Sequence, residues 1–220
     1  MSTVLITGAN RGVGLALAQH YHQAGWKVIG VCRSPSSELA DIAERVIDDI
    51  DITQEAQVAR LAAELDGSAL DLLINNAGLL RDESLGELNF DSIREQMEIN
   101  AYGPLRVTEA LLPLVAKGGK IANITSRMGS IADNDSGGRY GYRASKAALN
   151  AFGRSLAMDL KPRGIAVAQL HPGFVKTRMV NFGGQISPEE AAAGIAARIE
   201  ELTLENSGSF WHSNGETLPW

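Results

Sequence analysis

The sequence predicts an α/β fold, a doubly wound parallel sheet of seven strands within one domain. Short β-rich runs alternate with longer helical patterns along all 220 residues, which is typical of βαβ units with helices on both faces of the sheet. No linker, repeat or low-complexity tract divides the chain, so residues 1–220 are expected to form a single unit. The first strand opens directly into a glycine-rich loop and a helix, the arrangement of Rossmann-type domains.

Seven strands are expected where apolar and β-branched residues cluster between turn signals. They cover residues 3–7, 27–32, 45–50, 70–74, 120–125, 165–170 and 208–212, the last of them at a sheet edge. Six helical patterns lie between them, over residues 12–24, 38–44, 53–65, 91–116, 141–160 and 188–202. Gly25 is expected to end the first helix and Thr53 to cap the third. The pattern over 91–116 is expected to break near residues 100–104.

Composition excludes several classes of partner. Lys and Arg number 20 against 26 Asp and Glu, so the formal net charge is −6, which offers no footprint for nucleic acid or an anionic membrane. No apolar run approaches the ~20 residues that cross a bilayer, and strand residues begin at Val4, which leaves no room for a signal segment. Cys32 has no partner for an internal disulfide. The sequence therefore predicts a cytoplasmic protein, and no metal site is predicted.

The glycine-rich loop is typical of dinucleotide binding. Residues 7–14 read Thr-Gly-Ala-Asn-Arg-Gly-Val-Gly and join the first strand to the first helix. Glycines permit the tight turn and let the backbone approach a pyrophosphate at the helix N-terminus. The spacing is Gly-x-x-x-Gly-x-Gly, which differs from the standard Gly-x-Gly-x-x-Gly fingerprint. The loop residues expected to bind cofactor are Gly8, Asn10, Arg11, Gly12, Val13 and Gly14.

A second feature is Tyr142 with Lys146 four residues later, in a predicted helix. Positions i and i+4 share a helix face, so both side chains are expected to point into one cleft. A lysine cation at ~4 Å, with an effective dielectric of ~20, attracts a phenolate by about 4 kcal/mol before desolvation is subtracted. That attraction lowers a tyrosine pKa by roughly one to three units, toward the range of acid–base catalysis. Such a pair also arises on ordinary amphipathic helices.

Five motifs in chain order resemble those of the short-chain dehydrogenase/reductase family, and the resemblance extends over essentially the whole chain. The glycine loop resembles the family's Thr-Gly-x-x-x-Gly-x-Gly signature. The further motifs are the Asn-Asn-Ala-Gly run Asn75, Asn76, Ala77 and Gly78, the tetrad positions Asn100, Ser126, Tyr142 and Lys146, and the nicotinamide-holding segment with Pro172, Gly173, Val175 and Thr177. The resemblance implies one NAD(P)-binding Rossmann-fold domain that includes the substrate pocket.

The resemblance also implies roles for the tetrad. Tyr142 is the general acid toward a carbonyl oxygen in reduction and the base in the reverse direction. Ser126 donates a hydrogen bond to the same oxygen. Lys146 lowers the pKa of Tyr142 and binds the nicotinamide ribose, while Asn100 holds a water that links Lys146 to solvent. Tyr140 has no lysine four positions on, so it is expected to be a pocket wall or plain packing.

The end of the second strand favours NADP(H) over NAD(H). NAD-preferring sites place an acidic residue there, against the ribose 2′-hydroxyl. Here Cys32 is followed by Arg33, and no acid appears before Glu38. Arg33 is suited to a 2′-phosphate, and Arg11 can reach the same group from the glycine loop. Asp51 and Ile52, with Ala77 and Gly78, complete the expected cofactor contacts.

The substrate is left open between two function classes. Residues 128–131, 138–143 and 218–220 resemble a subgroup that contains both sniffer-type carbonyl reductases and C-factor-type signalling proteins. The first class reduces aldehydes, ketones or quinones with NADPH. The second class consists of signalling or regulatory proteins that bind the cofactor and for which catalytic turnover is secondary. The intact tetrad favours the enzyme, and the short segment from Arg178 to Ser187 predicts a brief substrate lid.

The expected partners are a small-molecule carbonyl or alcohol and further copies of the chain. The resemblance implies a homodimer or homotetramer. The helix over 141–160 carries a stripe of small and apolar residues that either faces a partner helix or covers the sheet. These residues are Ala147, Ala148, Ala151, Phe152 and Leu156.

Overall fold

A computed structural model describes all 220 residues and confirms the predicted fold class. One parallel sheet holds all seven strands, in the order β3-β2-β1-β4-β5-β6-β7. β7 is an edge strand, as predicted. The strands are β1 (Thr3–Thr7), β2 (Lys27–Val31), β3 (Arg45–Ile47), β4 (Leu70–Asn75), β5 (Val115–Ile124), β6 (Ala166–His171) and β7 (Ser209–His212).

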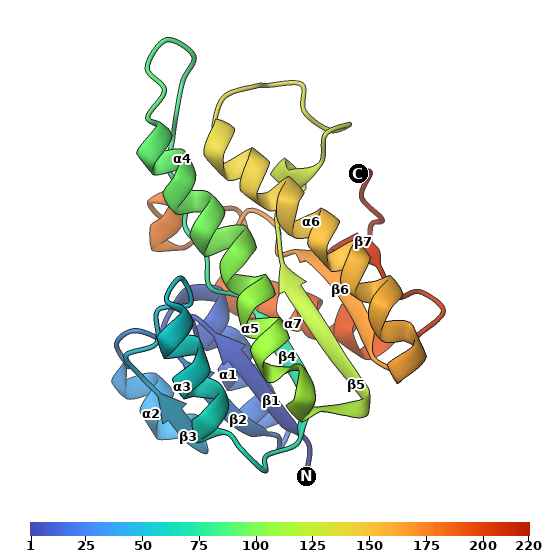
Figure 1. Ribbon diagram of the computed structural model, residues 1–220. Helices are drawn as coiled ribbons and strands as arrows, with labels where there is room; N and C mark the ends of the chain where they lie inside the picture. The colour runs from blue at the N-terminus through green and yellow to red at the C-terminus, as the bar shows by residue number, and fades with distance from the viewer.

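Helices cover both faces of this sheet (Figure 1). They are α1 (Gly12–Gln23), α2 (Ser37–Ile42), α3 (Glu55–Glu64), α4 (Phe90–Met97), α5 (Gly103–Leu111), α6 (Tyr140–Leu160) and α7 (Pro188–Glu201). α1 and α7 pack together on one face, around a core that includes Leu17 and Ile195. α3, α5 and α6 cover the other face, with Leu61, Leu111 and Leu160 in a second core.

The central strands are apolar on both sides because both of their faces are covered. Val4, Leu5 and Ile6 of β1 have no exposed surface. Val4 and Ile6 belong to the core under α1 and α7, whereas Leu5 belongs to the opposite core. This alternation follows from the two-residue period of a strand.

The long helical pattern over 91–116 departs from the prediction at both its middle and its end. The break expected near residue 100 is a π-helical turn, Glu98–Tyr102, between α4 and α5. α5 ends at Leu111 and a 3₁₀ turn (Leu112–Leu114) follows, because Pro113 has no N–H with which to continue the helix. The prediction that residues 115 and 116 are helical was wrong, since both lie in β5.

The predicted cap of the third helix was also wrong. α3 begins at Glu55 after Gln54, and Thr53 lies outside it. The Thr53 N–H and hydroxyl both donate to the Asp51 carboxylate, at 2.9 and 2.8 Å, so the Thr53 side chain is not free to cap. No helix of the chain is both long and apolar enough to pass through a bilayer.

Candidate active site

The predicted site residues gather at the carboxyl edge of the sheet, where open α/β folds bind ligands. The glycine loop follows β1, and the Asn-Asn-Ala-Gly run follows β4. Ser126 follows β5, and the Pro172-Gly173 segment follows β6. Because these four strands are neighbours, motifs far apart in sequence meet along one crevice.

The glycine loop is a compact turn with a close backbone approach. Gly8 and Gly12 have φ of 66° and 55°, in the left-handed region that favours glycine. A Cβ on Gly14 would collide with the Gly8 carbonyl oxygen and the Asn76 side-chain amide. Arg11 is the exposed N-cap of α1, and Val13 packs against the core. The loop thus leaves its backbone open to a diphosphate, which fits a nicotinamide dinucleotide.

Thr7 joins the glycine loop to the Asn-Asn-Ala-Gly run, 69 residues away in sequence. Its hydroxyl oxygen accepts from the backbone N–H groups of Asn76 and Ala77, at 3.0 and 3.1 Å. The Asn76 side chain donates back to the carbonyls of Thr7 and Gly8, at 3.0 and 3.2 Å. Asn75 lies beneath, buried, and donates to Thr108 and Asn123.

Gly78 lies where the Asn-Asn-Ala-Gly run meets the predicted tetrad. A Cβ placed on it would lie 3.3 Å from Asn100 Oδ1 and 3.7 Å from Lys146 Nζ. The Asn100 side-chain amide donates to the Leu79 carbonyl at 2.7 Å and to the Ser145 hydroxyl at 3.0 Å. Ser145 in turn donates to the carbonyl of Tyr142, at 2.9 Å. The structure therefore brings Asn100 and α6 together through Ser145.

Lys146 is buried beneath Tyr142. Its ammonium lies 6.0 Å from the centroid of the Tyr142 ring and donates to the Ile124 carbonyl at 2.9 Å. The residue is 4% exposed. Burial lowers the pKa of the Lys146 ammonium to about 8, so this lysine exchanges its proton near neutral pH.

Ser126 and Tyr142 are both nearly enclosed, at 7% exposure each. The Ser126 hydroxyl oxygen accepts from the Met128 N–H at 3.1 Å, which orients the turn after β5. Burial raises the pKa of Tyr142, and the Ser126 hydroxyl and the charge of Arg139 act in the opposite direction. The net direction is upward, whereas the resemblance implied a Tyr142 pKa lowered by Lys146.

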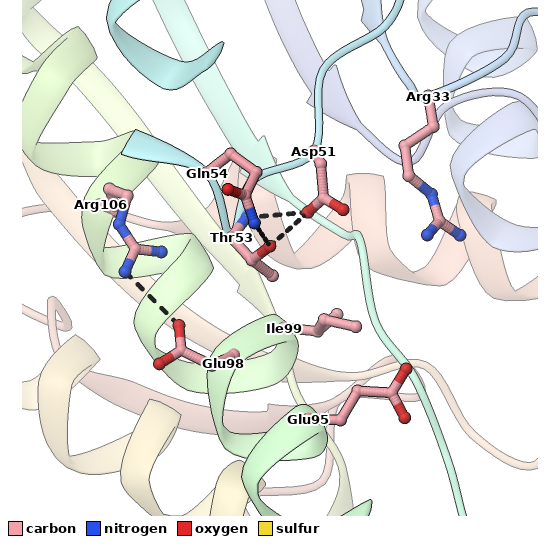
Figure 2. A pocket seen from close by; sticks show the side chains of 8 residues that line it. All are labelled: Arg33, Asp51, Thr53, Gln54, Glu95, Glu98, Ile99 and Arg106. Atoms are coloured by element: carbon pink, nitrogen blue, oxygen red, sulfur yellow. Dashed lines mark hydrogen bonds and ion pairs between the residues drawn. The ribbon is translucent and has the colours of Figure 1, made fainter. Parts of the chain in front are cut away.

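A polar cavity of about 410 Å³ lies at the other end of the crevice (Figure 2). Arg33 and Asp51 face it from the ends of the segments that follow β2 and β3. Asn10 ties the glycine loop to this region, because its side-chain amide donates to the Ser34 carbonyl at 2.7 Å. Ile52 is buried beside Gly103. The other lining residues are Thr53, Gln54, Glu95, Glu98, Ile99 and Arg106.

The segment after β6 reaches across to the glycine loop. Gly173 is left-handed, with φ of 92°, and the Pro172 carbonyl accepts from Ser213. A Cβ on Gly12 would lie 3.4 Å from the Thr177 methyl group, so these residues face each other. Val175 bridges to Ile186, which folds residues 174–186 into a small closed loop. The brief lid predicted from sequence is thus a compact turn.

Burial along α6 bears on two expectations, the stripe of small and apolar residues and Tyr140. Leu149 and Gly153 are buried, whereas the predicted stripe is half-buried or exposed, and of that stripe Leu156 packs against the second core. Phe152 of that stripe packs on Tyr102, with ring centroids 6.2 Å apart. Tyr140 is the first residue of α6 and is 40% exposed, and it does not line the cavity of Figure 2.

Sequence reasoning missed several residues that organise this site. Ser145 was detectable, because it directly precedes Lys146 and lies three residues after Tyr142. Thr7 is part of the Thr-Gly-x-x-x-Gly-x-Gly signature, but the sequence analysis assigned it no role. Glu83 and Arg139 carried no local signal, since their contacts join loops more than fifty residues apart.

Comparison with known proteins gives a consistent result. A family profile described as short chain dehydrogenase matches residues 2–185. A 1-hydroxy-2-glutathionyl-2-methyl-3-butene dehydrogenase of Rhodococcus sp. (strain AD45) is 43% identical over an alignment of 226 residues, covering 100% of both chains. The C-signal protein of Myxococcus xanthus is 42% identical over 154 residues, which cover 69% of this chain and 93% of that protein.

Two solved structures are similar along the whole chain. The NADPH-bound carbonyl reductase from chicken fatty liver has a TM-score of 0.92 at 31% identity, covering 100% of this chain and 99% of that one. The carbonyl reductase Sniffer of D. melanogaster has a TM-score of 0.91 at 29% identity, covering 100% of both. The resemblance inferred from the motifs is confirmed.

Proposed function

The chain belongs to the short-chain dehydrogenase/reductase family, and on that premise we propose that it is an NADPH-dependent carbonyl reductase. It acts on an aldehyde, ketone or quinone and yields the alcohol. The observation that carries the proposal is that Asn100 and Lys146 both lie beside Gly78, while Tyr142 and Ser126, each 7% exposed, interact through their hydroxyl groups. A module that only bound cofactor would have no use for a buried Ser–Tyr pair.

Each residue of the tetrad has a defined task in this proposal. The cofactor, when bound, supplies a hydride to the carbonyl carbon. The Tyr142 phenol gives its proton to the carbonyl oxygen, and the Ser126 hydroxyl donates a hydrogen bond to that oxygen. Lys146, with a pKa of about 8, is suited to return a proton to Tyr142 afterwards. Asn100 holds the loop that carries Gly78 and positions α6 through Ser145.

NADP(H) is proposed as the preferred cofactor because a cation stands where NAD-preferring sites place an acid. Arg33 faces the cavity of Figure 2 from the end of β2. Arg11 is exposed on the adjacent glycine loop, and Asn10 joins that loop to Ser34. A 2′-phosphate between Arg33 and Arg11 would form charge-assisted hydrogen bonds. The chicken carbonyl reductase, similar in fold, is bound to NADPH.

A cavity at Met128, two residues after Ser126, favours a polar substrate. Its volume is about 380 Å³, and Met128 is its one apolar lining residue. The remaining lining residues are Asp82, Glu83, Ser84, Ser136, Gly137, Gly138, Arg139 and Arg143. A substrate with charged or hydrogen-bonding groups suits this lining better than a plain hydrocarbon ketone. The Rhodococcus relative is named for a glutathionyl alcohol, so glutathione conjugates belong in the substrate panel.

The test is NADPH consumption against aldehydes, ketones and quinones, with NADP⁺ and alcohols, including glutathionyl alcohols, assayed in the reverse direction. Tyr142→Phe is expected to retain cofactor affinity and to lower turnover by at least about a hundredfold. Tyr140→Phe is the matched control, since this half-exposed phenol lies two residues away on the same helix. If Tyr142→Phe keeps its turnover, Tyr142 is not the group that donates the proton to the carbonyl oxygen.

A second candidate is a cofactor-binding signalling protein, favoured by the 42% identity to C-signal. It predicts saturable NADPH binding with no turnover of any carbonyl or alcohol in the panel. Turnover that depends on Tyr142 would decide for the reductase. Saturable NADPH binding without turnover would point to the signalling protein or to a narrow substrate outside the panel.

The protein is further proposed to act in the cytoplasm as a homodimer or homotetramer. The partly exposed stripe on α6 supports this assembly, because Phe152 and Tyr102 form an aromatic pair that solvent reaches. Light scattering on Phe152→Asp and on the unaltered protein tests it. A monomeric mass for the unaltered protein would contradict the proposal.

A further inference from the structure

The first turn of α6 has no cap of its own. Its N-cap residue, Arg139, has φ of 50° and makes no side-chain hydrogen bond to the helix, and the first turn contains no acidic residue. The start of a helix leaves backbone N–H groups that need acceptors from outside the helix, and it favours negative charge. At this helix the need bears on the site, because Tyr142 is its third residue and Lys146 lies one turn further on.

Glu83, in the loop after β4, supplies the missing acceptor. Its carboxylate accepts from the Gly141 N–H at 3.1 Å, across 58 residues of sequence. The same carboxylate accepts from the Ser92 hydroxyl at 2.9 Å and from the Gln96 side-chain amide, both on α4. Glu83 is 4% exposed, and these three donors are uncharged groups. A buried carboxylate is costly unless such donors satisfy it, so the Glu83 charge is held at the start of α6.

Two further contacts tie α6 to the segment that carries Glu83. The Glu83 carbonyl accepts from the Arg139 N–H at 2.9 Å, and the Asp82 carboxylate forms an ion pair with the Arg139 guanidinium. α6 also comes close to α4 here, since a Cβ on Gly141 would lie 2.5 Å from the Gln96 amide nitrogen and 3.1 Å from Glu83 Oε1. The start of α6 therefore has little room to move relative to this loop.

Another contact holds the backbone at Tyr142 itself. The Tyr142 carbonyl accepts from the Ser145 hydroxyl at 2.9 Å, and that hydroxyl accepts from the Asn100 amide at 3.0 Å. Glu83 holds the N–H of the preceding residue, Gly141. The direction of a side chain on a helix follows from its backbone, so the place of the phenol depends on both contacts.

We propose that Glu83 is a positioning residue of the active site, which caps α6 from the loop after β4 and thereby fixes where the Tyr142 phenol lies. The inference rests on the proposed function, in which that phenol gives its proton to the carbonyl oxygen. Proton transfer requires the donor to lie within hydrogen-bond reach of the acceptor. A displacement of about 1 Å can lower turnover by about a hundredfold. In this role Glu83 acts only through Tyr142 and touches neither substrate nor cofactor.

The test compares kcat, KM and the Kd for NADPH in Glu83→Ala, in Glu83→Gln and in the unaltered protein. Glu83→Ala is expected to lower kcat roughly ten- to a hundredfold and to change KM and the Kd less than about threefold. Glu83→Gln keeps an oxygen that can accept from the Gly141 N–H, so it is expected to retain more of kcat than Glu83→Ala. Glu190→Ala is the matched control and is expected to keep its kcat, because Glu190 also accepts a backbone N–H, that of Ser187, at the start of α7.

A second comparison measures whether Glu83 acts through Tyr142. In a protein that already carries Tyr142→Phe the phenol hydroxyl is gone, so adding Glu83→Ala is expected to lower the residual turnover by less than about twofold. A residue that only stabilised the fold would lower turnover by the same factor with and without that hydroxyl. The difference between the two factors therefore separates positioning from stability.

Three kinetic results would overturn the inference. These are an unchanged kcat in Glu83→Ala, an equal loss in Glu190→Ala, or an equal factor lost with and without the Tyr142 hydroxyl. If Glu83→Ala does not fold, Glu83→Gln takes its place in both comparisons, with a loss of roughly three- to tenfold expected in kcat.

Hydrogen exchange of the Gly141 amide, followed by NMR, provides a measurement that needs no turnover. Exchange is expected to be faster in both Glu83 variants, by roughly tenfold in Glu83→Ala, the size of one hydrogen bond to a charged group. An unchanged rate would overturn the inference. If the protein reduces no carbonyl, the proposed function fails, and this exchange rate still reports separately on the hold of Glu83 on α6.

Discussion

Asn100 and Leu79 are joined by a pair of hydrogen bonds, each 2.7 Å long. The Leu79 N–H donates to Asn100 Oδ1, and the Asn100 amide donates to the Leu79 carbonyl. Leu79 directly follows Gly78, and the same amide also donates to Ser145 on α6. The loop after the Asn-Asn-Ala-Gly run, the π-helical turn and α6 are therefore connected by one buried side chain. π-helical turns within α-helices are frequent at functional sites, and here the turn carries this side chain.

Loss of this connection is expected to be costly. Asn100→Ala leaves both backbone groups of Leu79 without a partner in a poorly hydrated place, and we expect a loss of about 2–4 kcal/mol in the free energy of unfolding. Urea denaturation measures it. Asn206→Ala is a matched control, because Asn206 also accepts from one backbone N–H and donates to one carbonyl, on an exposed loop. On this exposed loop water replaces the Asn206 side chain, so Asn206→Ala is expected to lower the free energy of unfolding by less than about 1 kcal/mol. Equal losses would mean that Asn100 is an ordinary loop residue.

Arg33→Ala is expected to weaken NADPH binding far more than NADH binding. Hydrogen bonds to a charged group contribute about 1.5–3 kcal/mol, so the Kd for NADPH should rise roughly ten- to a hundredfold. The Kd for NADH should change less than about threefold, since it has no 2′-phosphate for Arg33 to bind. Cofactor fluorescence titration gives both values, with Arg94→Ala as a charge-matched control. If the Kd values for NADPH and NADH rise by the same factor, Arg33 supports the structure of the site and does not bind the 2′-phosphate.

Gly14→Ala is expected to damage the glycine loop. The added methyl group would run into the Gly8 carbonyl and the Asn76 amide, so the loop must shift, at a cost of about 1–3 kcal/mol. Cofactor binding should be lost with it. Gly67→Ala is the comparison: Gly67 is left-handed, with φ of 78°, but a Cβ there meets nothing within 4 Å. It should lower the melting temperature slightly and leave the Kd for cofactor unchanged. If Gly14→Ala binds cofactor as tightly as the unaltered protein, Gly14 does not lie as close to the Gly8 carbonyl and the Asn76 amide as the structure shows.

His171 is expected to make the protein sensitive to acid. Burial lowers the pKa of His171 to about 3, and the charges of His212 and Arg127 act in the same direction. Below its ordinary pKa of 6.5 the unfolded chain binds a proton that the folded chain does not bind until about pH 3. Stability is therefore lost as pH falls through this window, by at most about 1.4 kcal/mol per unit.

His171→Gln removes this titration. The free energy of unfolding of the unaltered protein should fall more steeply between pH 6.5 and 4 than that of the variant. Chemical denaturation at a series of pH values provides the comparison, and carboxylates that titrate in both proteins cancel in the difference. Parallel curves would show that His171 is not buried in its neutral form.

The fold and much of the site followed from local signals. β1 was predicted to the residue, because its apolar run ends at the glycine loop, and a break was expected near residues 100–104, where the π-helical turn lies. The helix expected over 115–116 failed because an apolar Val-Ala pair suits strand and helix equally, and only pairing with β4 decided it. Thr53 failed as a cap because Asp51 engages its side chain.

Sequence by itself determined the order of elements, the parallel sheet and the motif residues, since strand period, helix period and turn chemistry act over a few neighbouring positions. It also placed Tyr142 and Lys146 on one helix. Only the tertiary structure decided which distant segments hold the charged residues on either side of Tyr142 in the chain. Arg139 is held by Asp82, 57 residues away, and Lys146 is held by the Ile124 carbonyl, 22 residues away. Electrostatic effects depend on burial and on distances between such segments, and no local pattern in the sequence encodes either.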